Sequence, residues 1–358
     1  MTFYNHFQLC SRSFTYFWKL ISGSDNHLGI LSSKRIFITG GTGTIGVTLV
    51  KYLSEKYPKT KITVYSRDEH KQFILARKYP AINCVLGDVR DKDRLEEAIA
   101  GHDVVIHLAA LKQVPRGESD GSEFTKTNIL GTENLLRVSS KVGIEKVVFM
   151  SSDKAVLPSS HYGATKLSGE RLTAEFAQRN PQTQYSIIRL GNVWKSRGSV
   201  SDLISNHSKE LFSVTNPDNT RFSIAPAEGV EIILLALMYG RKAEIFIPKM
   251  KSFKLHDLLI AADIQETTVV GLREGERMHE ILITDKELEK TFQHRDDFFI
   301  IVNQEDPNLR SKYISDFHLK PVSNGNIFHS EFAPKLEVTE LQTLLNKSDV
   351  SADGIHKE

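Results

Sequence analysis

The chain has 358 residues, of which 40% are apolar and 25% are charged, and its formal net charge is +2. This length supports a sizeable core, arranged as one large domain or two closely packed ones. The near-neutral charge gives no electrostatic reason to expect nucleic acid or an anionic membrane as a partner. Cys10 and Cys84 make no disulfide framework, and no Cys/His cluster has the spacing of a metal site. We therefore expect a cytoplasmic protein without a metal.

Residues 1–33 are predicted to form an aromatic-rich helical extension followed by a linker. One apolar stripe with helical spacing is formed by Phe3, Phe7, Cys10, Phe14, Phe17 and Ile21. The segment has no apolar run long enough to span a membrane and lacks the pattern of a secretory signal. We expect this helix to pack on the body of the protein or on a neighbouring subunit. Shallow insertion into a bilayer surface is disfavoured because basic residues are few.

From Lys34 onward, short β-branched runs alternate with helical patterns. Strands are predicted at 34–40, 61–66, 82–88, 103–110 and 146–152, and helices at 46–57, 69–79, 93–101 and 128–143. Unbroken apolar strands separated by helices predict a parallel sheet covered on both faces. The expected fold is α/β, a doubly wound Rossmann sheet with a smaller C-terminal substrate-binding lobe.

The domain boundaries follow from where this alternation ends. Residues 34–196 are predicted to form the dinucleotide-binding Rossmann domain. A later helix and strand within 226–250 return to that domain. Residues 197–302 are expected to be mainly the substrate-binding lobe, and residues 303–358 a C-terminal tail.

A glycine loop follows the first predicted strand and precedes a helix. In TGGTGTIG the glycines are spaced three apart, which allows backbone to approach a pyrophosphate at a helix N-terminus. This position in a strand–helix unit is the context that supports the motif. The predicted cofactor-binding residues of the loop are Gly40, Thr42, Gly43, Thr44, Ile45 and Gly46.

The end of the second strand indicates which dinucleotide is bound. An acid there binds the ribose diol of NAD, whereas an arginine can hold the additional phosphate of NADP. Ser66 and Arg67 occupy that position and Lys71 lies one helical turn further on, which favours NADP. Asp68 keeps NAD as the alternative. The cofactor is also expected to contact the ends of the next strands, at Asp88, Val89 and Leu108.

The stretch MSSDKAVLPSSHYGATK places an acid and a base after a buried strand. Asp153 and Lys154 follow Ser152, and Tyr162 and Lys166 lie one helical turn apart. A tyrosine and a lysine at this spacing are common in helices. After an apolar strand, in a chain with a glycine loop, they predict catalytic residues.

Together these motifs resemble those of the extended short-chain dehydrogenase/reductases, over roughly residues 34–302. The chain has in order the glycine loop, SRDEHK, GDVRD, HLAALKQVP, TNILGT, SSDKA and YGATK. Within that family it is similar to the UDP-N-acetylglucosamine 4,6-dehydratases that invert ring position five. The later blocks RLGNVWKSRGSV, EIFIPKMKS and REGERMHEILI agree with this resemblance.

The resemblance implies a role for each catalytic candidate. Tyr162, helped by Lys166 and the nicotinamide, would take the proton of the alcohol at carbon four, with Ser152 sharing the hydrogen bond. Lys154 would take the proton of carbon five, for which burial near other cations would have to lower its pKa. Asp153 would protonate the hydroxyl that leaves carbon six.

The resemblance also implies a set of substrate contacts. Lys112 would lie near both cofactor and substrate, and Asn128 would brace the active-site backbone. The remaining residues expected on the UDP-sugar side are Asn192, Arg197, Arg273 and Glu276. The chain departs from the family pattern at Gln113, Gly121 and Glu274, where His, Pro and Pro are usual.

Two other functions remain open from the sequence. A UDP-sugar 4-epimerase needs the tyrosine and its lysine but leaves Asp153 and Lys154 without a role. A non-catalytic NADP-binding regulator on the same fold would be expected to lose Tyr162 or Lys166. Related enzymes form oligomers, so the resemblance also implies a homo-oligomer.

Overall fold

The computed structural model describes residues 31–205, 212–294, 298–302, 307–322 and 324–346. The aromatic helix expected near the N-terminus, with Cys10, lies outside the described residues. Cys84 is a half-buried free thiol.

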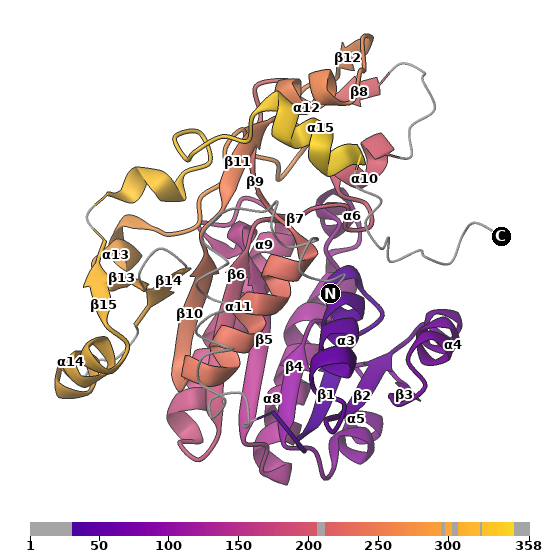
Figure 1. The fold of residues 1–358 in the computed structure, drawn as a ribbon, viewed down its shortest axis with the longest axis vertical. Coiled ribbons are helices and arrows are strands. Elements are labelled where there is room, and N and C mark those ends of the chain that lie inside the picture. Colours follow the sequence, from indigo (N-terminus) through magenta and orange to yellow (C-terminus); the bar gives the residue numbers. More distant parts are fainter. Residues whose placement is uncertain (1–30, 206–211, 295–297, 303–306, 323, 347–358) are drawn as a thin grey trace.

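A ten-stranded sheet runs through the molecule, in the order β15-β13-β14-β10-β6-β5-β4-β1-β2-β3 (Figure 1). Its seven strands from β3 to β10 are parallel, and the last three are antiparallel. The parallel strands are β1 Arg35–Thr39, β2 Lys61–Ser66, β3 Asn83–Leu86, β4 Val104–His107, β5 Lys146–Ser152, β6 Gln184–Leu190 and β10 Lys242–Pro248. The antiparallel strands are β13 Thr291–His294, β14 Phe298–Ile301 and β15 Leu319–Pro321. The predicted doubly wound parallel sheet is confirmed.

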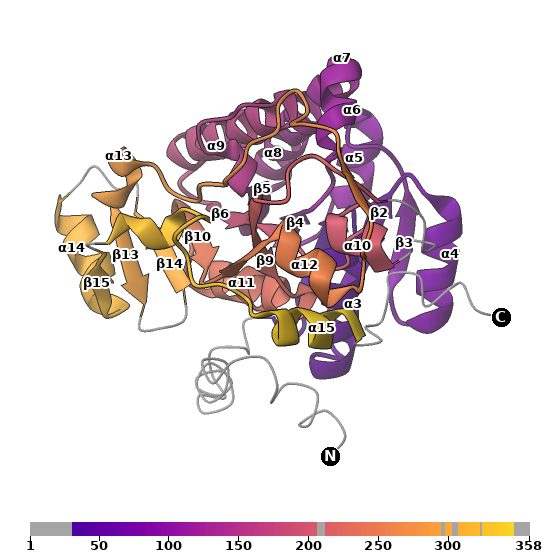
Figure 2. The ribbon, with the colours of Figure 1, turned by 90° about the horizontal axis from the view of Figure 1, so that it is seen from above.

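Helices cover both faces of this sheet (Figure 2). Helices α3 Thr44–Lys56 and α11 Pro226–Tyr239 pack together on one face. The opposite face carries α5 Lys92–Ile99, α8 Gly131–Val142 and α9 His161–Arg179, and α4 Glu69–Lys78 packs beside the edge strand β3. The strands read as apolar runs because both faces are buried: Ile36, Phe37 and Ile38 of β1 are fully inaccessible.

A smaller lobe lies at the carboxyl ends of the parallel strands. It contains two short sheets, of order β11-β9-β7 and β12-β8. Its strands are β7 Asn192–Val193, β8 Phe212–Val214, β9 Thr220–Ile224, β11 Lys251–Lys254 and β12 Thr267–Val269, and its helices are α10 Val200–Ser205, α12 Leu255–Ala261 and α15 Val338–Asn346. A separate apolar core, which includes Trp194, Phe253, Leu258 and Leu341, holds this lobe together.

The segment after residue 302, expected as a tail, contributes to both parts of the molecule. Strand β15 extends the main sheet, and α14 Pro307–Asp316 packs on it. Helix α15 packs against α12 in the small lobe. Strands β13 and β14, which fall within the expected lobe segment 197–302, also extend the main sheet. The short remaining helices include α6 Val114–Ser119, α7 Gly121–Phe124 and α13 Asp285–Leu288.

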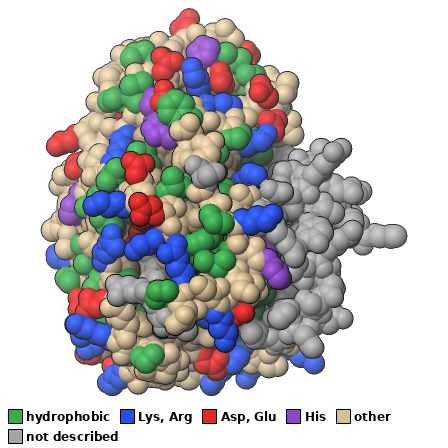
Figure 3. Space-filling view, turned by 90° about the vertical axis from the view of Figure 1, so that its left-hand side faces the viewer, with side chains coloured by type: hydrophobic (Ala, Val, Ile, Leu, Met, Phe, Trp, Pro, Cys, Tyr) green, Lys and Arg blue, Asp and Glu red, His purple; other side chains and the backbone are tan. Residues whose placement is uncertain are grey.

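The surface on the β15 side mixes acidic, basic and apolar side chains (Figure 3). This agrees with the near-neutral net charge of +2. Within the described ranges, no helix combines the length and the apolar character needed to cross a membrane.

Candidate active site

A cavity of about 670 Å³ lies between the main sheet and the small lobe. Its floor is formed by residues at the carboxyl ends of β1, β2, β4, β5 and β6. Strands β1 and β4 are neighbours, although β2 and β3 lie between them in the chain. Ligands of open α/β sheets bind at such a reversal of strand order.

The glycine loop joins β1 to α3 at one end of the cavity. Gly40 has a φ of +67°, and a Cβ there would lie 2.7 Å from the backbone nitrogen of Ala109. Glycine is therefore required by conformation and by close packing. Gly43 is the N-cap of the thirteen-residue helix α3, so the helix N-terminus faces the cavity without a capping side chain. All six predicted loop residues line the cavity.

The end of β2 supplies a second set of cavity residues. The Asp68 side chain accepts a hydrogen bond from the Lys71 backbone N–H at 3.0 Å and also binds the Lys71 ammonium. The pKa of Asp68 is lowered mainly by its bond with the Lys71 ammonium and secondly by the bond from the Lys71 backbone N–H. The guanidinium of Arg67 is half-exposed and lies 3.6 Å from Asp88. The other cofactor candidates that line the cavity here are Ser66, Val89 and Leu108.

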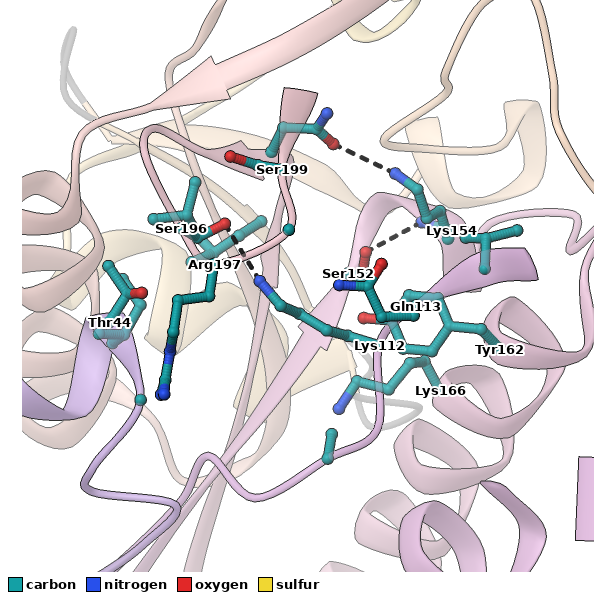
Figure 4. A pocket seen from close by; sticks show the side chains of 18 of the residues that line it. Thr44, Lys112, Gln113, Ser152, Lys154, Tyr162, Lys166, Ser196, Arg197 and Ser199 are labelled. Atoms are coloured by element: carbon teal, nitrogen blue, oxygen red, sulfur yellow. Dashed lines mark hydrogen bonds between the residues drawn. The ribbon is translucent and has the colours of Figure 1, made fainter. Parts of the chain in front are cut away.

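The catalytic candidates come from the end of β5 and the start of α9, on the opposite side of the cavity (Figure 4). The Ser152 side chain accepts the backbone N–H of Lys154 at 3.3 Å and so caps the short 3₁₀ turn Asp153–Ala155. Ser160 caps α9 by accepting the N–H of Gly163 at 3.1 Å. The helical spacing then directs Tyr162 and Lys166 to the same cavity, which Ser152 and Lys154 also line.

Asn128 fixes the backbone beside these residues. Its side-chain oxygen accepts the N–H of Leu111 at 2.8 Å, and its amide donates to the Leu111 carbonyl at 2.9 Å and to Thr165 at 3.0 Å. Asn128 lies in a π-helical segment, Thr125–Leu130, that precedes α8. The predicted bracing role of Asn128 is confirmed.

Asp153 lies behind the cavity wall. Its side chain is fully buried, and it is not one of the described residues that line the cavity. One carboxyl oxygen accepts Ser152 Oγ at 2.7 Å and Lys154 Nζ at 3.1 Å, while the other has no partner among the described residues. Burial raises the pKa of Asp153. Asp153, expected to protonate the leaving hydroxyl, therefore contacts the cavity-lining residues Ser152 and Lys154 and does not line the cavity itself.

Lys154 is held as an ammonium, contrary to the expectation from the sequence. Its Nζ lies 3.1 Å from Asp153 and 3.2 Å from Glu280. Burial disfavours the charge, but these two carboxyl groups outweigh burial and raise the pKa of Lys154. The expected lowering by nearby cations is wrong because carboxyl groups, not cations, are the nearest neighbours.

Tyr162 and Lys166 are both buried, and burial has opposite effects on their pKa values. Burial lowers the pKa of Lys166 to about 8, and its ammonium lies 4.6 Å from the ring centroid of Phe149. Burial raises the pKa of Tyr162, and Lys154 and the Ser152 hydroxyl only partly offset it. The expected lowering of the Tyr162 pKa by Lys166 is therefore not found in the protein alone.

The predicted substrate-binding residues divide into two groups, and all of them except Arg197 belong to the first. Lys112 Nζ donates to Ser196 Oγ at 3.1 Å, and burial lowers the pKa of Lys112. Asn192 accepts a hydrogen bond from Lys154 Nζ at 3.3 Å. Arg273 and Glu276 line the cavity with them.

Arg197 belongs to the other group, although it also lines the cavity. Its Nη2 donates to the Thr42 carbonyl at 2.9 Å, so the guanidinium lies against the glycine loop (Figure 4). The sequence places it in the small-lobe segment, but its long side chain reaches across the cavity. The Arg197 guanidinium therefore lies at the glycine-loop end of the cavity.

Sequence reasoning missed Glu280 and Arg221. Both line the cavity, and Arg221 Nε lies 3.7 Å from Glu280. Arg221 Nη2 also donates to Glu276 at 2.9 Å. Glu280 is the last residue of the quoted block REGERMHE, which was the available signal. Nothing in that block indicates that it would meet Lys154.

The fold and this cavity define an α/β protein of the extended short-chain dehydrogenase/reductase type. The chain belongs to the polysaccharide biosynthesis protein family, which it matches over residues 36–302. This confirms the resemblance drawn from the motifs.

Individual relatives include enzymes of two activities. The chain is 42% identical over 273 residues to the UDP-N-acetylglucosamine 4,6-dehydratase (inverting) of Campylobacter jejuni, covering 74% of this chain and 81% of that protein. It is 35% identical over 326 residues to the UDP-glucose 4-epimerase of Rickettsia massiliae, covering 87% and 95%. The X-ray structure of Pen from Bacillus thuringiensis superposes with a TM-score of 0.79 at 31% identity, covering 88% and 98%.

Proposed function

We propose that this protein is a UDP-N-acetylglucosamine 4,6-dehydratase that inverts ring position five and serves surface glycan synthesis. The observation that carries the proposal is Lys154, which faces the cavity beside Tyr162, Lys166 and Ser152. A reaction that only oxidises and reduces carbon four needs Tyr162 as its base, and Lys154 would then have no role. The 42% identity to a dehydratase of this name supports the same reaction.

The residues of the cavity fit a nicotinamide dinucleotide, which would supply hydride acceptance and return when bound. The uncapped N-terminus of α3 and the close approach at Gly40 suit its pyrophosphate. We propose NADP rather than NAD because Lys71 closely binds Asp68, whereas Arg67 is half-exposed at the cavity and makes only a longer, 3.6 Å ion pair with Asp88. Arg197, against the glycine loop, would hold the dinucleotide from the small-lobe side.

The first chemical task falls to Tyr162. It must accept the proton of the carbon-four alcohol while Ser152 holds that oxygen. Because burial raises the pKa of Tyr162, the phenolate needs positive charge beside it. Lys166, one helical turn away, and the oxidised nicotinamide ring would provide that charge.

The ketone at carbon four makes the proton at carbon five acidic, and Lys154 then acts. The free amine is the minor form of Lys154, because its pKa is raised. That form would take the proton and become an ammonium, which Glu280 stabilises at 3.2 Å. Asp153, whose pKa is raised by burial, can retain a proton. We propose that Ser152 gives its own hydroxyl proton to the departing hydroxyl and takes the Asp153 proton in its place, which reverses the hydrogen bond that Ser152 donates to Asp153 at 2.7 Å. Asp153 would thus act without touching the sugar.

The UDP group is assigned to the small-lobe side of the cavity. Arg273 would bind the diphosphate and Glu276 the ribose, with Lys112 between sugar and cofactor. Asn192 would orient the sugar next to Lys154, to which it is bonded. These assignments agree with the cavity lining.

A UDP-sugar 4-epimerase is the second candidate, favoured by the 35% identity to an enzyme of that name over 87% of this chain. The experiment that separates the two is incubation with UDP-N-acetylglucosamine and NADP, followed by NMR of the product. We expect a 4-keto-6-deoxy sugar. A product changed only in configuration at carbon four would instead establish the epimerase.

The proposal includes a cytoplasmic homo-oligomer. Light scattering of the purified full chain tests the assembly: a mass of two or more subunits is expected, and a monomer at micromolar concentration would contradict it.

A further inference from the structure

Glu280 provides a carboxylate to the active site from the small-lobe side of the chain. Its Oε1 lies 3.2 Å from Lys154 Nζ, and the side chain is only 5% exposed. Lys154 lies in the 3₁₀ turn that directly follows β5, so this ion pair joins two segments that are distant in sequence. A buried charge pair is retained only where its partners are satisfied.

The two carboxyl groups beside Lys154 differ in their surroundings. Glu280 lines the cavity and has a second cation, Arg221, at 3.7 Å. Asp153 is fully buried, and one of its oxygens has no partner among the described residues. Two cations near Glu280 favour its ionised form, whereas burial favours the neutral form of Asp153.

We propose that Glu280 is a positioning residue that serves as the counter-ion of Lys154, holds its Nζ at the cavity wall and leaves Asp153 neutral. This inference rests on the proposed dehydratase function and deepens it. The counter-ion has two opposing effects on a base. It lowers the population of the free amine at a given pH, and it makes each free amine a stronger acceptor of the carbon-five proton.

Other charged groups also face this pair and must be considered. Lys154 interacts electrostatically with Asp153, Glu280, Arg221 and Tyr162. Lys112 also lies close enough to interact with Lys154, and Arg277 with Glu280. Within this set Glu280 is the carboxylate that both lines the cavity and directly contacts Lys154.

The test compares Glu280→Gln with Glu280→Asp and with the unmodified protein. The rate of deuterium incorporation at carbon five is measured by NMR from pH 6 to pH 10, with NADP and UDP-N-acetylglucosamine. In Glu280→Gln the acidic limb of the pH–rate profile, where the rate rises with pH, should move to lower pH by about one unit or more. This is the effect of removing an opposite charge within about 4–6 Å. The wild-type rate should still be rising at pH 10, because the pKa of Lys154 is raised above its ordinary 10.5. Glu280→Asp should keep the limb near its original position.

Glu287→Gln is the matched control, because it removes a part-buried carboxylate that is bonded to Arg189 and not to Lys154. It should leave the limb unmoved even if it lowers stability. Melting temperatures of all variants identify any that fail to fold. If Glu280→Gln does not fold, the pKa of Lys154 is measured in the wild type from its ¹³Cε shift: a pKa above the ordinary 10.5 supports the counter-ion, and a pKa at or below 10.5 overturns it.

The outcomes separate this inference from the function beneath it. A limb that stays in place in folded Glu280→Gln, with a uniform loss of rate, would overturn the role of Glu280 and leave the dehydratase intact. A wild-type protein that makes no 4-keto-6-deoxy product would overturn the function itself.

Discussion

Tyr162 owes its chemistry to burial and to its position on α9. Its ring packs edge-on against Phe124, with centroids 6.4 Å apart, and its hydroxyl faces the cavity that Ser152 lines. Replacing tyrosine by phenylalanine keeps the ring and removes only the proton acceptor. We predict that Tyr162→Phe lowers turnover by about 10²- to 10⁴-fold, the usual contribution of general base catalysis.

The measurement is the steady-state rate of 4-keto product formation, with NADP affinity as the control. Affinity should change by less than about tenfold, because the hydroxyl contributes at most one hydrogen bond to binding. Turnover close to that of the wild type would remove Tyr162 from the mechanism.

Cofactor preference is a second question at the scale of single residues. Arg67 is half-exposed at the end of β2, where the additional phosphate of NADP would lie. We predict that Arg67→Ala weakens NADP binding by about 10- to 100-fold, the effect of losing one charge-assisted hydrogen bond. NAD binding should change little.

Titration calorimetry with both dinucleotides checks this prediction. Arg94→Ala offers a control, since Arg94 is a surface residue of α5 whose side chain bonds Glu97 and the Leu86 carbonyl. Equal losses for NADP and NAD in Arg67→Ala would assign Arg67 to packing rather than to phosphate recognition.

At the scale of elements, the contact between α9 and the 3₁₀ turn sets the active-site geometry. A Cβ at Gly163 would lie 2.2 Å from the backbone oxygen of Lys154, so glycine lets the two segments touch. We predict that Gly163→Ala destabilises the protein by about 1–3 kcal/mol, as overpacking usually does. It should also reduce turnover, because the backbone of Lys154 must move.

Denaturant unfolding and turnover measured on the same variant test this point. Gly121→Ala is the matched control, because its new Cβ would meet His161 at an ordinary 3.5 Å. The prediction fails if Gly163→Ala and Gly121→Ala have equal stability and activity.

The sequence predicts the elements of the parallel sheet well, because local signals specify them. Apolar runs identify β1 to β5 and β10, and glycine spacing identifies the cofactor loop, whereas β6 is not among the predicted strands. What it does not predict depends on contacts between distant segments. The Glu280–Lys154 pair, the reach of Arg197 to Thr42 and the burial of Asp153 follow from how the small lobe closes on the sheet. No local periodicity records those contacts.

The same limit applies to the segment after residue 302. Its short strand β15 and helices α14 and α15 have weak individual signals, and each is fixed by packing on elements far away in the sequence. Helix α15 bonds the active-site loop directly: the indole of Trp194 donates to the Leu344 carbonyl at 3.1 Å. The segment after residue 302, which the sequence pattern predicts to be a tail, therefore helps to hold the cavity wall.

At the scale of the whole molecule, a buried ion network joins strand β6 of the main sheet to helices α9 and α13. Arg189 of β6 is 1% exposed and bonds Glu170 of α9 and Glu287 of α13, at 2.7 Å and 2.9 Å for its Nη2. Burial opposes the charge of Glu287, but Arg189 outweighs it and lowers the pKa of Glu287 below its ordinary 4.5. A carboxyl with a lowered pKa stabilises the fold at pH values above 4.5.

We therefore predict that this stabilisation is complete near neutral pH and is lost as pH falls from 4.5 through the lower folded-state pKa. Melting temperatures from pH 7 to pH 3.5 should show Glu287→Gln less stable than the wild type at pH 7. The difference should shrink as Glu287 of the wild type becomes protonated. A difference that is constant across this range would show that the charge of Glu287 contributes nothing.

The most direct measurement follows the proton at carbon five. The wild type and Lys154→Ala are incubated with UDP-N-acetylglucosamine and NADP in deuterated water, and the sugar is examined by NMR. The account predicts deuterium at carbon five of a 4-keto-6-deoxy product for the wild type. It predicts none for Lys154→Ala, whose NADP affinity should be retained. Deuterium at carbon five in Lys154→Ala at a rate near that of the wild type would contradict the account.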